Sequence, residues 1–208
     1  MSERKSSKMR NKIKLFAFFM VAVLCFSAIM LVATAQNCSA AERKVKNVII
    51  MIPDGCGDTH TTLARWYSGE DLALDQMPSG LIRTYAAESI IVDSAPAATA
   101  YSTGYKTSDK YLGILPGPVT IPGVEVPAAD QQYKPVANVM EAAKAKGMSV
   151  GLVATSTIQH ATPAGFSAHW PDRANYNEIA EQQIYLEMDV VFGGGAQYLL
   201  PISEGGKR

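Results

Sequence analysis

Two stretches of the sequence carry side chains whose type and position could do chemistry. The first is Asp54, which follows the apolar run 46–52 in the sequence Pro-Asp-Gly. If this run is a strand of a parallel sheet, Asp54 lies at its carboxyl end, where such sheets bind ligands. A carboxylate is a hard oxygen ligand for Zn²⁺ or Mg²⁺. The alternative is that Asp54 only shapes the turn, and its position alone leaves both interpretations open.

Ser94 begins the second stretch, a run of small residues over 94–100 that favours a helix. We expect Ser94 to be the N-cap of this helix, with Pro96 in its first turn. A hydroxyl there lies at the positive end of the helix, beside backbone N–H groups that can hold a phosphate. A plain capping serine is the commoner case, so the local pattern does not by itself establish a nucleophile.

Several motifs, taken in order, resemble the alkaline phosphatase family over roughly residues 45 to 200. Besides Asp54-Gly55, they are residues 91–99 (IVDSAPAAT), 103–107 (TGYKT), 156–164 (STIQHATPA), 168–173 (AHWPDR) and 192–195 (FGGG). Three positions depart from the family pattern: Pro96 replaces a small residue, Pro53 a glycine and Cys56 a methionine. We expect Cys56 to pack in the interior, with a metal contact as the alternative.

The resemblance implies roles for five residues. Ser94 matches the serine that attacks phosphorus and becomes a transient phosphoserine, and Arg173 matches the guanidinium that grips the phosphate. Asp54 matches a carboxylate shared between a zinc and the magnesium. His160 and Thr162 match the pair beside the magnesium. The implied cofactors are therefore Zn²⁺ and Mg²⁺.

These residue types suit phosphoryl transfer. Coordination of Ser94 to zinc would lower the pKa of its hydroxyl enough to present an alkoxide. The planar fork of Arg173 can bind two phosphoryl oxygens at once. Asp93 either orients Arg173 and so belongs to the phosphate-binding set, or is only an acidic residue at a helix start. Because imidazole suits zinc better than magnesium, His160 leaves the occupant of the third metal site open.

The elements that must position these residues alternate between helix and strand. This order predicts an α/β fold with a largely parallel central sheet flanked by helices, incomplete in this chain. A strand is expected at 46–52, a further extended segment at 80–86, and strands at 149–155 and 189–192 before the turn 193–195. Helices are expected at 136–146, stopped by Gly147, and at 175–186. Residues 111–135, rich in Pro and Gly, are expected to form a surface loop.

The amino-terminal 41 residues are expected to be a targeting segment, followed by one phosphatase-type domain part over 42–208. They hold six Lys or Arg and one acidic residue, all of them ahead of the apolar run 15–35. This pattern predicts a secretory signal peptide, with an uncleaved membrane anchor as the alternative, and hence a periplasmic, cell-surface or secreted protein. A single cysteine in the body, Cys56, provides no disulfide framework.

The net negative charge of residues 42–208 argues against one class of function. Residues 42–208 carry 13 basic against 18 acidic side chains, which excludes the basic footprint of a dedicated nucleic-acid binder. The resemblance implies small phosphomonoester substrates, a homodimer, and further metal ligands in a second half of the domain. Two hypotheses follow: the nucleophile-bearing half of an active phosphatase, or an inactive exported polypeptide. A sulfatase or phosphodiesterase is a weaker alternative, because residues 93–95 do not resemble the sulfatase motif.

Overall fold

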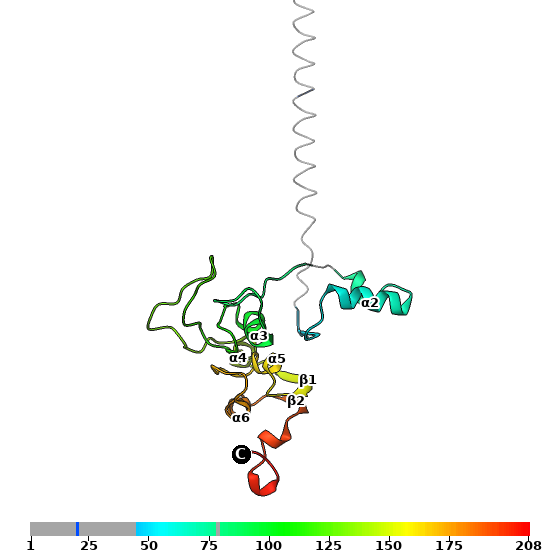
Figure 1. The fold of residues 1–208 in the computed structure, drawn as a ribbon. Coiled ribbons are helices and arrows are strands. Elements are labelled where there is room, and N and C mark those ends of the chain that lie inside the picture. The colour runs from blue at the N-terminus through cyan, green and yellow to red at the C-terminus, as the bar shows by residue number, and fades with distance from the viewer. Residues whose placement is uncertain (1–19, 21–44, 78–79) are drawn as a thin grey trace, which may run out of the picture. The chain divides into compact units, whose positions relative to one another are not determined.

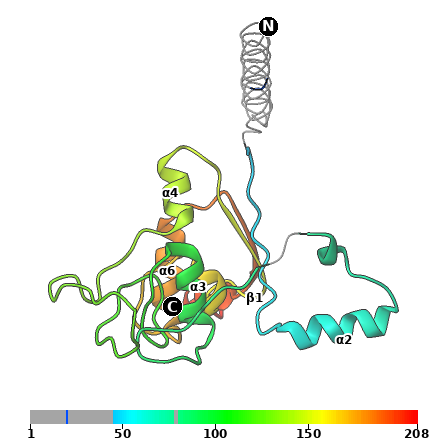
Figure 2. The same ribbon diagram turned by 90° about the horizontal axis from the view of Figure 1, so that it is seen from above.

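The computed structural model describes residues 20, 45–77 and 80–208 of the chain (Figure 1; Figure 2). The expected leader over 1–41 lies outside the described residues except for Met20. The chain divides into two compact units, residues 1–51 and 52–208. In the described part of the chain, no helix is both long and apolar enough to cross a membrane. All of the elements below belong to the second unit.

Within the described residues, the sheet consists of two parallel strands, β1 (Gly151–Thr157) and β2 (Val190–Gly194). They lie side by side in Figure 1. Gly151, Leu152 and Val153 pair with Val190, Val191 and Phe192, and the register then shifts before Thr157 meets Gly194. These strands begin one or two residues later than the sequence predicted. Their parallel pairing, with helices between them, confirms the predicted α/β class in a partial form.

The expected strand at 46–52 is wrong for this structure. Residues 45–52 have no strand assignment, and Ile49 and Met51 are each 86% exposed. An apolar strand of this kind is stable only when it is paired and covered on both faces. Within the described residues, the only ladder joins β1 and β2. Residues 80–86 likewise form no strand, although this segment leads into the buried Ala86 and Ala87.

Four α-helices lie between residue 94 and β2. They are α3 (Ser94–Thr103), α4 (Val139–Ala145), α5 (Ala161–Ala164) and α6 (Tyr176–Tyr185). Helix α4 is shorter than the predicted 136–146 because Asn138 caps it, accepting from the backbone N–H groups of Met140 and Glu141 at 2.9 and 3.0 Å. The helix ends at Ala145, and Gly147 two residues later has φ +72°, in agreement with the predicted stop. Helix α3 packs against α5 through buried alanines, which lets the two backbones approach closely.

Helix α2 (Asp58–Ser68) and the short helix η1 (Ala73–Gln76) are not among the predicted elements. Helix α2 has no buried residue, and its large apolar side chains, such as Trp66, are exposed. Leu63, Trp66 and Tyr67 nevertheless recur at helical spacing, so the sequence did contain a signal for α2. Two further short helices, η2 (Ala196–Tyr198) and η3 (Ile202–Glu204), follow β2. Residues 111–135 contain no helix or strand, as predicted, but Leu112, Ile114 and Pro116 are buried, so the first part of this segment belongs to the core and is not a surface loop.

Asp75 is expected to titrate far below an ordinary aspartate. Arg65 Nε donates to Asp75 Oδ2 at 2.9 Å, Nη2 donates to Oδ1, and the Leu72 N–H donates at 2.9 Å. The Arg65 hydrogen bonds, and after them the Leu72 N–H, lower the pKa of Asp75 from 3.8 to about 2. Because the folded pKa is depressed, the ionised carboxylate stabilises this contact above about pH 4, and that stabilisation is lost as the pH falls through about 2.

A carbon-13 NMR titration of the Asp75 carboxyl measures this pKa directly. Replacing Arg65 with methionine should return it most of the way to 3.8, whereas the remote Arg83→Met should leave it near 2. A pKa that does not respond to Arg65→Met would show that the two side chains are not paired in solution.

Gly195, at the turn after β2, is expected to tolerate no side chain. Its φ is +102°, and a Cβ there would lie 2.0 Å from Oε1 of the fully buried Gln159. Gly195→Ala should therefore lower the free energy of unfolding by about 2 kcal/mol or more. Gly123 has φ +81° with nothing within 4 Å of its Cβ position, so Gly123→Ala should cost only about 1 kcal/mol of strain. Urea unfolding compares them, and equal losses would contradict the steric argument.

Candidate active site

The site is built around the first turn of α3. Asp93, not Ser94, is the N-cap, because its Oδ1 accepts the Ala95 N–H at 2.9 Å. Ser94 is the first helical residue and is half-buried, with Pro96 in the first turn as expected. The N-cap therefore lies one residue before the predicted position. Asp and Ser are both good N-caps, so the sequence pattern could not choose between them. The Ser94 hydroxyl still lies at the positive end of the helix.

Arg173 joins this helix start from a distant part of the chain. Its Nη1 donates to Asp93 Oδ2 and to Ser94 Oγ, both at 2.9 Å. Its Nη2 lies 3.1 Å from His160 Nε2. The Arg173 and Asp93 side chains are 21% and 37% exposed, so solutes can reach this ion pair. The guanidinium thus links the predicted nucleophile, its acidic neighbour and the predicted metal-site histidine.

The peptide that carries Arg173 is fastened to a neighbouring segment. The backbone N–H of Arg173 donates to Lys110 O at 3.0 Å. Leu112 and Trp170 form an antiparallel bridge, with both of its hydrogen bonds at 2.9 Å. Lys110 had no role in the sequence prediction, because a backbone carbonyl leaves no signal in a motif.

A second cluster lies at the start of α5. Thr162 Oγ1 donates to Asp54 Oδ2 at 2.8 Å, across 108 positions of the sequence. His160 is the N-cap residue of α5, two residues before Thr162, although its side chain makes no capping bond. Asp54 is exposed and Thr162 is half-buried. The fold therefore brings into contact two oxygens that the family resemblance assigns to the metal region.

These residues fit an oxygen-ligated cation in part. A carboxylate and a hydroxyl in contact are ligands of the kind Mg²⁺ prefers. Among the described residues, however, no three His, Cys, Asp or Glu side chains gather as a metal site, so the nitrogen-rich set expected for zinc is not seen there. Cys56 is exposed rather than packed inside, which corrects that expectation. It follows the exposed turn at Asp54, where no core is available to cover it.

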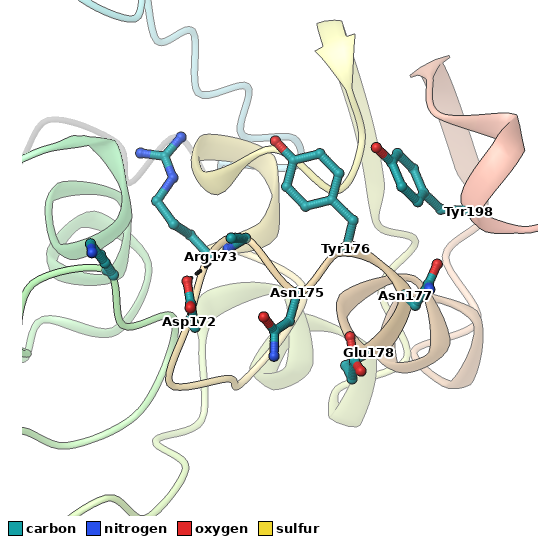
Figure 3. A pocket seen from close by; sticks show the side chains of 9 residues that line it. Asp172, Arg173, Asn175, Tyr176, Asn177, Glu178 and Tyr198 are labelled. Carbon is teal, nitrogen blue, oxygen red and sulfur yellow. Dashed lines mark hydrogen bonds between the residues drawn. The ribbon is translucent and has the colours of Figure 1, made fainter. Parts of the chain in front are cut away.

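A cavity of about 620 Å³ opens beside Arg173 (Figure 3). Tyr176 and Tyr198 meet edge to face in its wall, with ring centroids 4.9 Å apart at 82°. In Figure 3 the side chains of Arg173, just before α6, and of Tyr176, its first residue, point in the same general direction. The cavity is lined by Lys110, Asp172, Arg173, Ala174, Asn175, Tyr176, Asn177, Glu178 and Tyr198.

Comparison with known proteins identifies the family. Residues 45–207 match the family model described as alkaline phosphatase. The chain belongs to the alkaline phosphatase family. Alkaline phosphatase 3 of Bacillus subtilis is 34% identical to it over 203 residues, covering 88% of this chain and 40% of the Bacillus protein. The predicted resemblance is therefore confirmed.

Solved alkaline phosphatases are similar in structure to this chain over part of their length. The cold-active enzyme from a psychrophilic Shewanella species is 30% identical with a TM-score of 0.66, covering 77% of this chain and 39% of that one. A histidine-to-glutamate variant of the TAB5 alkaline phosphatase, from an Antarctic bacterium, has a TM-score of 0.58 at 31% identity and covers 70% of this chain and 38% of that one. That variant has Mg bound in its M3 site. The chain spans about two fifths of the length of each of these relatives.

Proposed function

We propose that residues 45–207 are the nucleophile-bearing part of an alkaline phosphatase that hydrolyses phosphomonoesters through a phosphoserine at Ser94. The observation that carries the proposal is the position of Arg173 Nη1, 2.9 Å from both Asp93 Oδ2 and Ser94 Oγ. One guanidinium thereby stands beside the hydroxyl at the amino end of α3, where a phosphoryl group would be attacked. Family membership supports the reaction class.

The reaction has two steps with Ser94 at the centre. In the first, Ser94 Oγ bonds to phosphorus as the bond from phosphorus to the ester oxygen breaks, and the hydroxyl proton ends on the departing alcohol. In the second, water attacks the phosphoserine, its oxygen replaces Oγ, and one of its protons returns to Ser94 as inorganic phosphate leaves. A covalent intermediate divides one difficult displacement into two easier ones.

Arg173 holds the phosphoryl group for both steps. Its planar fork offers parallel N–H donors that match two phosphoryl oxygens and balance their charge. Asp93 keeps the guanidinium aimed at Ser94 through the 2.9 Å contact to Nη1. Backbone N–H groups at the start of α3 add a further positive field. These residues bind and orient the phosphate.

Asp54, Thr162, His160 and Ser94 are the residues through which this chain would hold Zn²⁺ or Mg²⁺. The contact between Asp54 and Thr162 supports a magnesium-type site, and the Mg-bound TAB5 relative supports the cofactor class. A bound cation supplies positive charge that lowers the pKa of the Ser94 hydroxyl and neutralises the phosphoryl oxygens. Further ligands are required from residues beyond this set. A homodimer and export by the leader over 1–41 belong to the same proposal.

A catalytically inactive polypeptide that binds phosphate or one metal weakly is the second candidate. It is favoured by the lack of a three-residue metal cluster among the described residues. The two candidates share the Ser94 and Arg173 site and differ in whether metal-dependent turnover occurs. A direct activity measurement separates them.

The test is a graft in which residues 45–207 replace the matching segment of Bacillus subtilis alkaline phosphatase 3. This supplies the remainder of a family domain. With Zn²⁺ and Mg²⁺ present, the graft is expected to hydrolyse a chromogenic aryl phosphate and to lose that activity with a chelator. A folded, metal-loaded graft without turnover would contradict the first candidate. Assaying the 208-residue chain alone shows whether it turns over by itself.

A further inference from the structure

His169 is held at both nitrogens of its ring, although no role is predicted for it from the sequence. Its Nδ1 lies 2.7 Å from Gly113 O, and its Nε2 lies 2.8 Å from Glu141 Oε1. The ring is therefore held between a backbone carbonyl oxygen and a carboxylate oxygen, one at each nitrogen. The side chain is 15% exposed. It joins the start of α4 to the segment around Gly113.

The backbone of His169 is held as firmly as its ring. Its N–H donates to Gln182 Oε1 at 2.6 Å, and its carbonyl accepts from Gln182 Nε2 at 2.9 Å. Gln182 belongs to α6, so His169 fastens three separate parts of the chain. Gly113, with φ +57°, leaves room for the ring, because a Cβ there would lie 2.5 Å from His169 Nδ1.

The contacts of His169 with Gly113, Glu141 and Gln182, called the clasp below, hold the start of the segment that carries Arg173. His169 lies four residues before Arg173. Trp170 pairs with Leu112 immediately after the clasp, and the Arg173 N–H ends the pairing at Lys110 O. His169 and Arg173 therefore bracket one short length of backbone. A shift of the first would move the second, because only three residues separate them.

The opposite side of the clasp is attached to the helix that bears Ser94. The Gly113 N–H donates to Thr99 Oγ1 at 3.0 Å, and Thr99 Oγ1 donates to Tyr111 O at 3.3 Å. Thr99 lies within α3 and is 1% exposed. Segment 110–113 is thus fixed to α3, and His169 fixes the Arg173 segment to 110–113.

We infer that His169 is a positioning residue: its two ring contacts set the distance between the Arg173 guanidinium and Ser94. The inference rests on the proposed function, in which Arg173 grips the phosphate. Without the ring contacts, the segment 169–173 keeps its pairing with 110–113 but loses its fixed start. The Arg173 guanidinium is then hydrogen-bonded to Asp93 and Ser94 for a smaller fraction of the time.

Chemical modification of Arg173 by phenylglyoxal tests this in the full 208-residue chain, without needing turnover. Peptide mass spectrometry follows each arginine separately. His169→Ala should speed modification of Arg173 several-fold while leaving Arg208, which pairs with Glu181 at 3.3 Å, unchanged. His169→Asn, whose amide nitrogen can replace Nδ1 at Gly113 O, should give an intermediate rate. This partial rescue is not expected of a general loss of stability.

The outcomes separate the inference from the function on which it rests. An unchanged Arg173 rate in His169→Ala, or an equal rise at Arg208, would overturn the positioning role. Inorganic phosphate, added with Zn²⁺ and Mg²⁺ to the graft that supplies the remaining ligands, should slow modification of Arg173. If phosphate gives no protection while His169→Ala still exposes Arg173, the proposed phosphate site is wrong and the clasp stands.

Discussion

Ser94→Ala is expected to lower hydrolysis of an aryl phosphate by about 10⁴-fold or more in the graft, because no other group can form the phosphoserine. The fold should be retained, since within the described part of the chain Ser94 Oγ has one hydrogen-bond partner, the Arg173 guanidinium. Circular dichroism and bound-metal analysis check that retention. Ser203→Ala, at an exposed serine of η3, is the matched control and should leave the rate unchanged.

Near-wild-type turnover by the Ser94→Ala graft would show that the hydroxyl at the start of α3 is not the nucleophile. A small residual activity would leave the assignment intact, because Arg173 and the residues that would hold the cations remain. The size of the rate relative to that of the unsubstituted graft distinguishes these two cases.

Arg173→Ala is expected to raise the inhibition constant for inorganic phosphate by about 10- to 100-fold, since charge-assisted hydrogen bonds contribute about 1.5–3 kcal/mol. The loss should be larger than for Arg173→Lys, which keeps the charge but not the planar fork. The inhibition constant of Asp93→Asn should lie between those of Arg173→Lys and Arg173→Ala. The amide retains an oxygen that accepts from Nη1 but loses the ionic attraction. Competitive inhibition of aryl phosphate hydrolysis provides the constants.

Equal inhibition constants for Arg173→Ala and the unsubstituted graft would contradict the phosphate-binding role. The comparison with Arg173→Lys adds a second criterion. If lysine restores full affinity, the group acts as a point charge and not as a fork.

Local signals predicted the later elements of the fold better than the first. Helix α4 ends at Ala145, two residues before Gly147 and close to the predicted place, and Tyr176–Tyr185 is the predicted helix 175–186 less one residue at each end. Such helices are specified by caps and by neighbours a few positions away. The segment 46–52 has an equally clear apolar pattern but no strand in the structure. A strand depends on partners that the segment itself does not contain.

For the site as well, the local sequence predicted short-range features but not the contacts between distant residues. The motif around Ser94 predicted a helix start, but not which of Asp93 and Ser94 caps it, because helix ends are ambiguous by a residue or two. The contacts of Arg173 with Ser94 and of Thr162 with Asp54 span 79 and 108 positions. Spacing alone cannot predict such contacts, and only the family resemblance placed them together. The clasp at His169 uses a carbonyl and a capping glutamate, which no catalytic motif includes.

The most direct test of the central claim is to look for the covalent intermediate itself. The graft, loaded with Zn²⁺ and Mg²⁺, is mixed with an aryl phosphate, quenched in acid and analysed by peptide mass spectrometry. The proposed chemistry predicts one added phosphoryl group on the peptide that contains Ser94, and none in Ser94→Ala. Sustained turnover with that peptide unmodified, or with the phosphoryl group on a different residue, would contradict Ser94 as the nucleophile.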